Sequence, residues 1–114
     1  MAGPCAPTIR SWPLDCSDES CVFHLFPIRT TRRDALRQAL GDSGIETGVH
    51  YSPALSSQPA LAAYSRAEPL AGADGWAERE LSLPIFPEMR SDEIERVAAA
   101  VTRFAGDDCD HDRR

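Results

Sequence analysis

The chain has 114 residues, of which 18 are acidic and 12 are basic, so its formal net charge at neutral pH is −6. All of the basic residues are arginine, and the sequence contains neither lysine nor asparagine. Without a lysine amine, the chain cannot form a side-chain Schiff base with a carbonyl compound, nor can it supply the phosphate-binding lysine of a P-loop.

An acidic chain is also a poor candidate for binding nucleic acid, because the neutralisation of phosphates provides most of the non-specific affinity. No apolar run approaches the roughly 20 residues that a membrane span needs. The first residues lack the apolar core of a signal peptide, which makes the cytoplasm the expected location. The four cysteines lack the paired C-x2-C spacing of a zinc site, and in a reducing compartment we expect free thiols: Cys5, Cys16, Cys21 and Cys109.

Residues 1–20 carry proline, serine and acidic residues without periodicity, which predicts an extended or disordered lead-in. In Cys21–Phe26 both alternating sets of side chains are largely apolar, which is typical of a strand buried on two faces. Pro27 cannot donate a ladder hydrogen bond, so this strand either ends there or has an open edge there.

A helix is predicted to begin after Thr31, a candidate N-cap, with Asp34 in a position that resembles a capping box. Its apolar stripe consists of Ala35, Leu36, Ala39 and Leu40. Gly41 and Gly44 provide stops at which φ can be positive. The alternation in Ile45–Tyr51 then predicts a short strand.

The middle of the chain is irregular. Pro53 and Pro59 bracket a predicted turn, and Pro59 is suited to open a short helix. Residues 67–75 predict a loop, and residues 76–79 a helical turn. Residues 81–87 alternate as a strand does, but their two prolines confine that strand to an edge or to extended structure.

The last helix has the clearest pattern. Ser91 is the expected N-cap, and Asp92 and Glu93 lie in the first turn, where the helix dipole favours acidic residues. The apolar face repeats at three and four residues and consists of Ile94, Val97, Val101 and Phe104. Gly106 is expected to end the helix.

This order of elements predicts a small two-layer α/β fold, of the α+β kind, in which a short sheet packs against helices. The domain is expected to span residues 21–106, after the lead-in of residues 1–20 and before a charged tail of residues 107–114. We find no internal repeat and no interdomain linker.

The strongest candidate site is the pair His50 and Tyr51, at the end of a predicted strand, where rigid scaffolds often present functional side chains. A histidine can exchange a proton near neutral pH, and a tyrosine hydroxyl can orient a sugar or phosphate oxygen. The alternative, which the residue pattern alone favours, is that His50 is an ordinary hydrogen-bonded residue at a strand end.

Other chemistry-bearing residues have plainer interpretations. His24, inside an apolar segment, is predicted to be a satisfied core residue. Residues 108–112 have side chains of metal-binding type, including Cys109 and His111, but they form a charged run near a chain end and predict no metal site. Two pairs of carboxylates are expected on exposed surface: Glu78 with Glu80, and Glu93 with Glu95. No G-x-S-x-G nucleophile elbow occurs.

Four segments, in this order and at about this separation, resemble the C-terminal portion of the DegT/DnrJ/EryC1/StrS family of pyridoxal-phosphate-dependent sugar aminotransferases. They are VFHLFPIR at 22–29, RDAL at 33–36 with GIETGVHY at 44–51, ELSLPIFPEM at 80–89, and DEIERV at 92–97. The resemblance covers roughly Cys21 to Phe104, which corresponds to the last third or quarter of a family member.

The resemblance implies the small C-terminal domain of the type I aminotransferase fold, which closes over a cofactor-binding large domain. Members of the family are typically homodimers with shared sites, and they transfer an amino group to a keto group on a nucleotide-linked sugar. His50 and Tyr51 match the family's substrate-facing motif. The resemblance puts the catalytic lysine and the contacts to pyridoxal phosphate outside this chain, so we expect no catalytic residue and no bound cofactor in the isolated chain.

One position departs from the family pattern, which usually has a second histidine where Ser56 stands. A serine hydroxyl reaches less far than an imidazole and does not titrate near neutrality. Three hypotheses follow. The chain is a truncated or split component of an aminotransferase that needs a separate large-domain chain or a homodimer; or it is a non-catalytic interaction or oligomerisation module; or it is a decayed remnant.

Overall fold

The computed structural model describes residues 9–11, 22–64, 68 and 70–111. The predictions for Cys5, Cys16 and Cys21 lie outside these residues, as do most of the expected lead-in and the side chains of the expected tail, residues 107–114.

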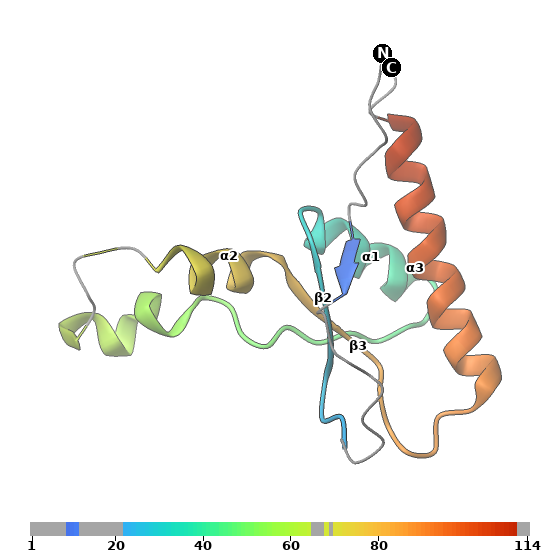
Figure 1. The fold of residues 1–114 in the computed structure, drawn as a ribbon, viewed down its shortest axis with the longest axis horizontal. Helices are drawn as coiled ribbons and strands as arrows, with labels where there is room; N and C mark the ends of the chain where they lie inside the picture. The colour runs from blue at the N-terminus through green and yellow to red at the C-terminus, as the bar shows by residue number, and fades with distance from the viewer. Residues whose placement is uncertain (1–8, 12–21, 65–67, 69, 112–114) are drawn as a thin grey trace.

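A three-stranded antiparallel sheet lies at the centre of the molecule (Figure 1), in the order β1 (Ile9–Ser11), β2 (Phe26–Thr30) and β3 (Glu80–Leu83). The central strand begins at Phe26 and runs through Pro27, so the predicted strand Cys21–Phe26 is wrong in its bounds. Pro27 fits because β1 pairs only with residues 28–30 among the described residues, which leaves that edge of β2 open at the proline.

The two faces of the sheet differ in polarity. In β3, alternation puts Leu81 and Leu83 on one face, and Glu80 and Ser82 on the other. Cross-strand partners share a face, and Leu81 is opposite the buried Ile28 of β2. One face is therefore apolar, and the other carries a buried carboxylate and a buried hydroxyl.

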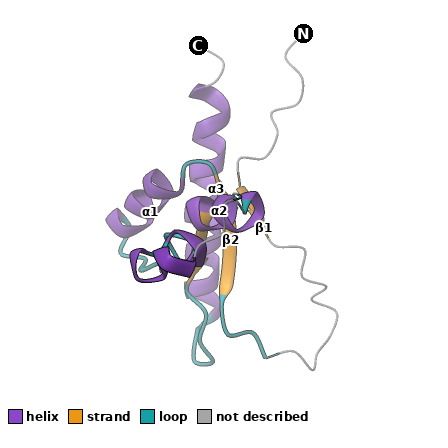
Figure 2. Cartoon of the chain, turned by 90° about the vertical axis from the view of Figure 1, so that its left-hand side faces the viewer, coloured by secondary structure: helices purple, strands orange, loops and turns teal. Residues whose placement is uncertain are grey.

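Two helices, α1 (Arg33–Asp42) and α3 (Ser91–His111), pack with the apolar face of the sheet (Figure 2). The buried core joins residues of the sheet, of α1 and of the segment after α1: Ile28, Leu36, Leu40, Ile45 and Leu81. Val97, Val101 and Phe104 of α3 pack against this core. The predicted α/β fold in two layers is confirmed. The predicted apolar stripes are confirmed in part, because Ala35 of α1 and Ile94 of α3 are exposed and do not reach the core.

The ends of α1 differ from the prediction. Its N-cap is Arg32, not Thr31, and the Thr30 hydroxyl accepts a hydrogen bond from the Arg32 backbone N–H at 3.1 Å. Gly41 lies inside the helix, so it is not a stop. Gly44 has φ of 71°, and the chain turns there as expected.

The helix α3 also differs at both ends. It includes Ser91, and the preceding Arg90 donates its backbone N–H to the Glu93 carboxylate at 2.9 Å, which is one half of a capping box. It continues past Gly106 to His111, so the predicted end at Gly106 is wrong. An isolated glycine costs a helix only about 1 kcal/mol, which the rest of a 21-residue helix can offset.

The middle of the chain forms an arm that projects from the sheet (Figure 1) and contains two short 3-10 helices, η1 (Leu55–Ser57) and η2 (Pro59–Tyr64), and the helix α2 (Ala71–Arg79). The short helix predicted from Pro59 is confirmed. The loop predicted over residues 67–75 is wrong from Ala71 onward. The helix α2 includes two glycines, and its other end packs on β2, where the Arg29 guanidinium lies 5.7 Å from the centroid of the Trp76 ring.

Among the described residues, no helix is both long and apolar enough to cross a lipid bilayer.

Candidate functional site

The predicted strand Ile45–Tyr51 is an extended segment that joins the sheet at one point. The backbone N–H of Gly48 donates to the carbonyl oxygen of Ser82 at 3.0 Å, and the N–H of Ser82 donates to the carbonyl oxygen of Gly48 at 2.8 Å. The prediction of a strand is therefore wrong, because only this bridge forms. The bridge nevertheless brings His50 beside the polar residues of β3.

Three side chains meet at this junction. The Ser82 hydroxyl donates a hydrogen bond to Oε1 of Glu80 at 2.5 Å, and Nδ1 of His50 lies 2.9 Å from the same hydroxyl oxygen. The backbone N–H of His50 donates to Oε2 of Glu80 at 2.6 Å. Both carboxylate oxygens of Glu80 thus have a donor.

The carboxylate of Glu80 is wholly shielded from solvent, since the residue is 0% exposed, and Ser82 is 5% exposed. A carboxylate without hydrogen-bond donors would be costly at such a position. The prediction that Glu80 lies on exposed surface is wrong, because the segment that carries His50 folds over this face of β3. Alternation in β3 indicates that Glu80 and Ser82 share a face, but the residue pattern of the strand does not reveal what covers that face.

These residue types also occur in hydrolase triads, in which a histidine accepts the proton of a serine nucleophile while a carboxylate orients the histidine. Here the connections differ. The serine hydroxyl donates to the carboxylate, and the histidine contacts that hydroxyl through Nδ1. With Ser82 buried as well, the arrangement orients His50 and does not activate a nucleophile.

A cavity of about 550 Å³ opens next to this cluster. Residues from the strand β3, from α3 and from the segment after α1 line it, among them His50, Ser82, Glu46, Glu93 and Arg96. His24 lines it too and is exposed in a bend outside any strand, so the prediction of a core histidine is wrong. The apolar pattern suggested that this segment is buried between strands. The segment instead precedes β2 and is not buried there.

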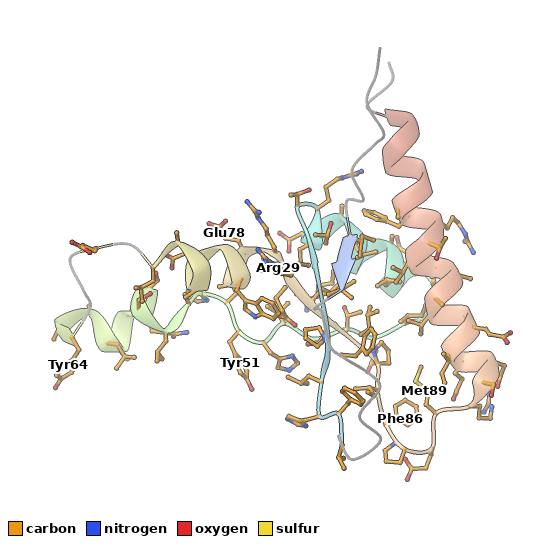
Figure 3. All side chains as sticks on the ribbon, viewed as in Figure 1. Arg29, Tyr51, Tyr64, Glu78, Phe86 and Met89 are labelled. Atoms are coloured by element: carbon orange, nitrogen blue, oxygen red, sulfur yellow. The ribbon has the colours of Figure 1, made fainter. Side chains whose placement is uncertain are left out.

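Tyr51 lies next to His50 with its ring edge-on, the centroids 5.1 Å apart and the planes at 88°. It is 73% exposed and lies between the sheet and the projecting arm (Figure 3). The tyrosine is therefore accessible to another molecule, whereas the histidine is half-buried and held by Ser82.

Ser56, the departure from the family pattern, lies in η1. Its hydroxyl oxygen is buried and has no hydrogen-bond partner among the described residues. The serine hydroxyl therefore makes no hydrogen bond within the described part of the chain that could take the place of one made by the family's histidine.

The other predicted carboxylates lie apart from the cluster. Glu78, on α2, and Glu95, on α3, are exposed as expected. Glu93 is half-buried, lines the cavity and caps α3 through the Arg90 backbone N–H. No group of three or more metal-ligand side chains occurs in the described part of the chain.

An apolar cavity of about 670 Å³ lies between the sheet and α3. Several large side chains along it retain solvent exposure: Phe26 38%, Ile85 36%, Phe86 47% and Ile94 53%. Phe86 and Met89 lie together in the loop between β3 and α3 (Figure 3). A group of exposed apolar side chains of this kind is typical of a surface that contacts another protein surface.

The fold is that of a domain from an aminotransferase. Residues 7–102 match the DegT/DnrJ/EryC1/StrS aminotransferase family, and the chain belongs to that family. It is 39% identical over 94 residues to a dTDP-3-amino-3,4,6-trideoxy-alpha-D-glucose transaminase of Streptomyces venezuelae, covering 82% of this chain and 25% of that protein. It is also 39% identical over 82 residues to a UDP-N-acetyl-3-dehydro-alpha-D-glucosamine 3-aminotransferase of Acidithiobacillus ferrooxidans, covering 72% of this chain and 22% of that protein.

Solved structures agree. The crystal structure of DesV from S. venezuelae, in complex with a ketimine intermediate, superimposes with a TM-score of 0.78 at 38% identity, over 87% of this chain and 27% of that one. An aminotransferase from Brucella abortus of the same family gives a TM-score of 0.67 at 26% identity, over 72% of this chain and 22% of that one. The chain thus spans about a quarter of the length of the relatives it matches.

The family depends on pyridoxal phosphate, and the residues of this chain do not fit that group. The cavity beside His50 contains no amine that could bond to an aldehyde, and none of the 114 residues is a lysine.

Proposed function

We propose that the chain is the small C-terminal domain of a nucleotide-sugar aminotransferase and that His50 and Tyr51 contact the sugar. The match of residues 7–102 to the family is the observation that carries this proposal. It is supported by relatives named as transaminases of dTDP-linked and UDP-linked sugars. The amino-group transfer then requires a lysine-bearing large domain from outside these 114 residues.

Tyr51 and His50 can contribute different hydrogen bonds to a bound sugar, because Tyr51 is exposed and the ring of His50 is fixed by Ser82. Tyr51 offers an accessible ring and a hydroxyl that both donates and accepts hydrogen bonds. His50 offers the ring nitrogen that Ser82 does not occupy. Sugar hydroxyls need such directed partners, because they lose their hydrogen bonds to water on binding.

The experiment is co-expression with a family large domain encoded near this chain, followed by co-purification and a transaminase assay on a nucleotide-linked keto sugar. We expect a stable complex whose turnover falls at least tenfold in H50A or Y51A, in line with the loss of a directed hydrogen bond. A pair that never associates and adds no turnover would refute the split-enzyme form.

The proposed location is the cytoplasm, which fractionation of the producing cell would test.

A non-catalytic interaction module is the second candidate, and the exposed apolar side chains beside α3 favour it. In this form the surface binds a partner or a second copy without any amino transfer. Sedimentation of the purified chain separates the two cases. A clean monomer that binds no large-domain chain would count against the module, whereas self-association without turnover would favour it.

A further inference from the structure

The hydrogen bonds of the Ser82 hydroxyl determine which nitrogen of His50 carries a proton. A hydroxyl has a single proton to donate. At 2.5 Å, the contact between Ser82 Oγ and Glu80 Oε1 has the length of a charge-assisted hydrogen bond, so the serine proton lies toward the carboxylate. The hydroxyl oxygen is then only an acceptor toward the imidazole.

Nδ1 of His50, at 2.9 Å from that oxygen, must therefore be the donor. In a neutral imidazole one nitrogen donates and the other accepts, so Nε2 is left without a proton. Nε2 has no hydrogen-bond partner among the described residues. The ring that carries it belongs to a residue lining the cavity of about 550 Å³.

Two further contacts fix the carboxylate and the ring. The backbone N–H of His50 occupies the second oxygen of Glu80 at 2.6 Å, so the carboxylate cannot turn away without losing a buried bond. The imidazole lies against Gly48, where a side chain would leave no room, since an added Cβ would be 2.6 Å from Cε1 of the ring.

We propose that Glu80 and Ser82 are positioning residues that hold His50 in its Nδ1–H form and present Nε2 as a hydrogen-bond acceptor. If His50 contacts the sugar, which rests on the proposed function, its partner is a hydroxyl that donates a proton and not a keto oxygen. The tautomer itself does not depend on that function.

The test is ¹⁵N NMR of the 114-residue chain labelled in its histidines, at about pH 8, where an ordinary histidine is neutral. The His50 signals are identified by their loss in H50Q. We expect Nδ1 to have the chemical shift of a protonated nitrogen and Nε2 that of an unprotonated one. A protonated Nε2 in the wild-type chain would overturn the proposal without any variant.

Variants sharpen the test. In E80Q the single amide oxygen must face the His50 backbone N–H, which turns the amide nitrogen toward Ser82. The serine then accepts from the new amide group and donates to Nδ1, so we expect the tautomer to switch to Nε2–H. The matched control is E46Q, an exposed carboxylate of the same cavity, which should leave the tautomer unchanged.

Serine variants separate positioning from a structural role. S82A should abolish the preference for the Nδ1–H form, whereas S82T should retain it because threonine keeps the hydroxyl. Amide dispersion in the same samples reports whether each variant is folded. A folded E80Q and a folded S82A that both keep the wild-type tautomer would overturn the proposal. If the chain assembled with a large domain shows no transamination although His50 is in its Nδ1–H form, that result would count against the proposed function and not against the assigned tautomer.

Discussion

A Cβ atom built on Gly48 would lie 2.6 Å from Cε1 and 3.3 Å from Nε2 of His50. The same glycine makes the two backbone hydrogen bonds that join its segment to Ser82. The ring cannot keep its place beside a larger residue, so G48A should displace the imidazole and lower the free energy of unfolding by about 1–3 kcal/mol. Urea denaturation measures the stability, and the ¹⁵N shifts of His50 report the position of its ring.

The control is G41A. Gly41 lies inside α1, and apart from its chain neighbours and the backbone of its own helix no atom lies within 4 Å of an added Cβ, so alanine should raise the free energy of unfolding by about 0.5–1 kcal/mol. The same substitution is made at both glycines, but of the two only Gly48 has the His50 ring against it. Equal stability of G48A and wild type, with unchanged His50 signals, would contradict the tight contact.

The sequence indicated His50 but not the two residues that hold it. Strand alternation in β3 puts Glu80 and Ser82 on one face, yet alternation alone predicts that the polar face of a two-layer sheet meets solvent. The burial comes from the segment after α1, which pairs with β3 through one bridge across more than 30 residues of chain. Such a contact depends on tertiary packing, which no local pattern encodes.

An arginine–aspartate pair lies at the start of α3. The guanidinium of Arg90 donates to both carboxylate oxygens of Asp92 at 2.9 Å, and these hydrogen bonds lower the pKa of Asp92. A carboxyl group whose pKa is lowered by folding stabilises the folded state at pH values above its ordinary pKa of about 3.9. That stability is lost as the pH falls through the lowered pKa.

We expect R90Q to return the Asp92 pKa toward its ordinary range, as followed by ¹³C NMR of the carboxyl group during a pH titration. High salt should weaken the effect in the wild-type chain, because the pair is exposed. R103Q, a substitution further along the same helix, is the control and should leave Asp92 unchanged. An Asp92 pKa that does not respond to R90Q would refute the assigned cause.

The helix α1 is held to the sheet by leucines that the sequence pattern identified. Leu36 is 0% exposed, so L36A should reduce the free energy of unfolding by about 2–5 kcal/mol, the range for deleting a buried side chain. L55A makes the same substitution at a position 73% exposed, where the change should stay within about 0.5 kcal/mol. Similar losses at both positions, measured by urea denaturation, would contradict the described core.

Elements with long amphipathic patterns were predictable, and short or glycine-containing ones were not. The apolar stripes of α1 and α3 appear in the sequence at helical spacing. The strand β1 has only three residues and owes its existence to pairing with β2. The helix α2 contains glycines that favour loops locally, and its packing on β2, where Trp76 contacts Arg29, outweighs that preference.

The whole chain lacks the group that would bond covalently to pyridoxal phosphate. Incubation of the isolated chain with pyridoxal phosphate, borohydride reduction and peptide mapping should therefore find label only at the α-amino group, because no side-chain amine exists. The control is an intact family aminotransferase treated in the same way, which should be labelled at its lysine. Label on any side chain of this chain would contradict the expectation.

The projecting arm and the apolar cavity beside α3 both leave large side chains in solvent. On the arm, Tyr64 is 83% exposed and lies far from the sheet (Figure 3), and beside α3 Phe86 is 47% exposed. A chain that spans about a quarter of its relatives would expose such surfaces where the rest of an aminotransferase packs. The proposed function therefore predicts that these surfaces contact the large domain.

The most direct test is a chimera in which this chain replaces the matched quarter of the Streptomyces venezuelae transaminase. The measurement is the rate at which the chimera transaminates that enzyme's dTDP-sugar substrate. We predict turnover by the chimera, a loss of at least tenfold in H50A, and little change in H111A, a histidine at the end of α3. A folded, dimeric chimera without turnover, or full activity in H50A, would contradict the proposal that this chain completes a sugar site through His50.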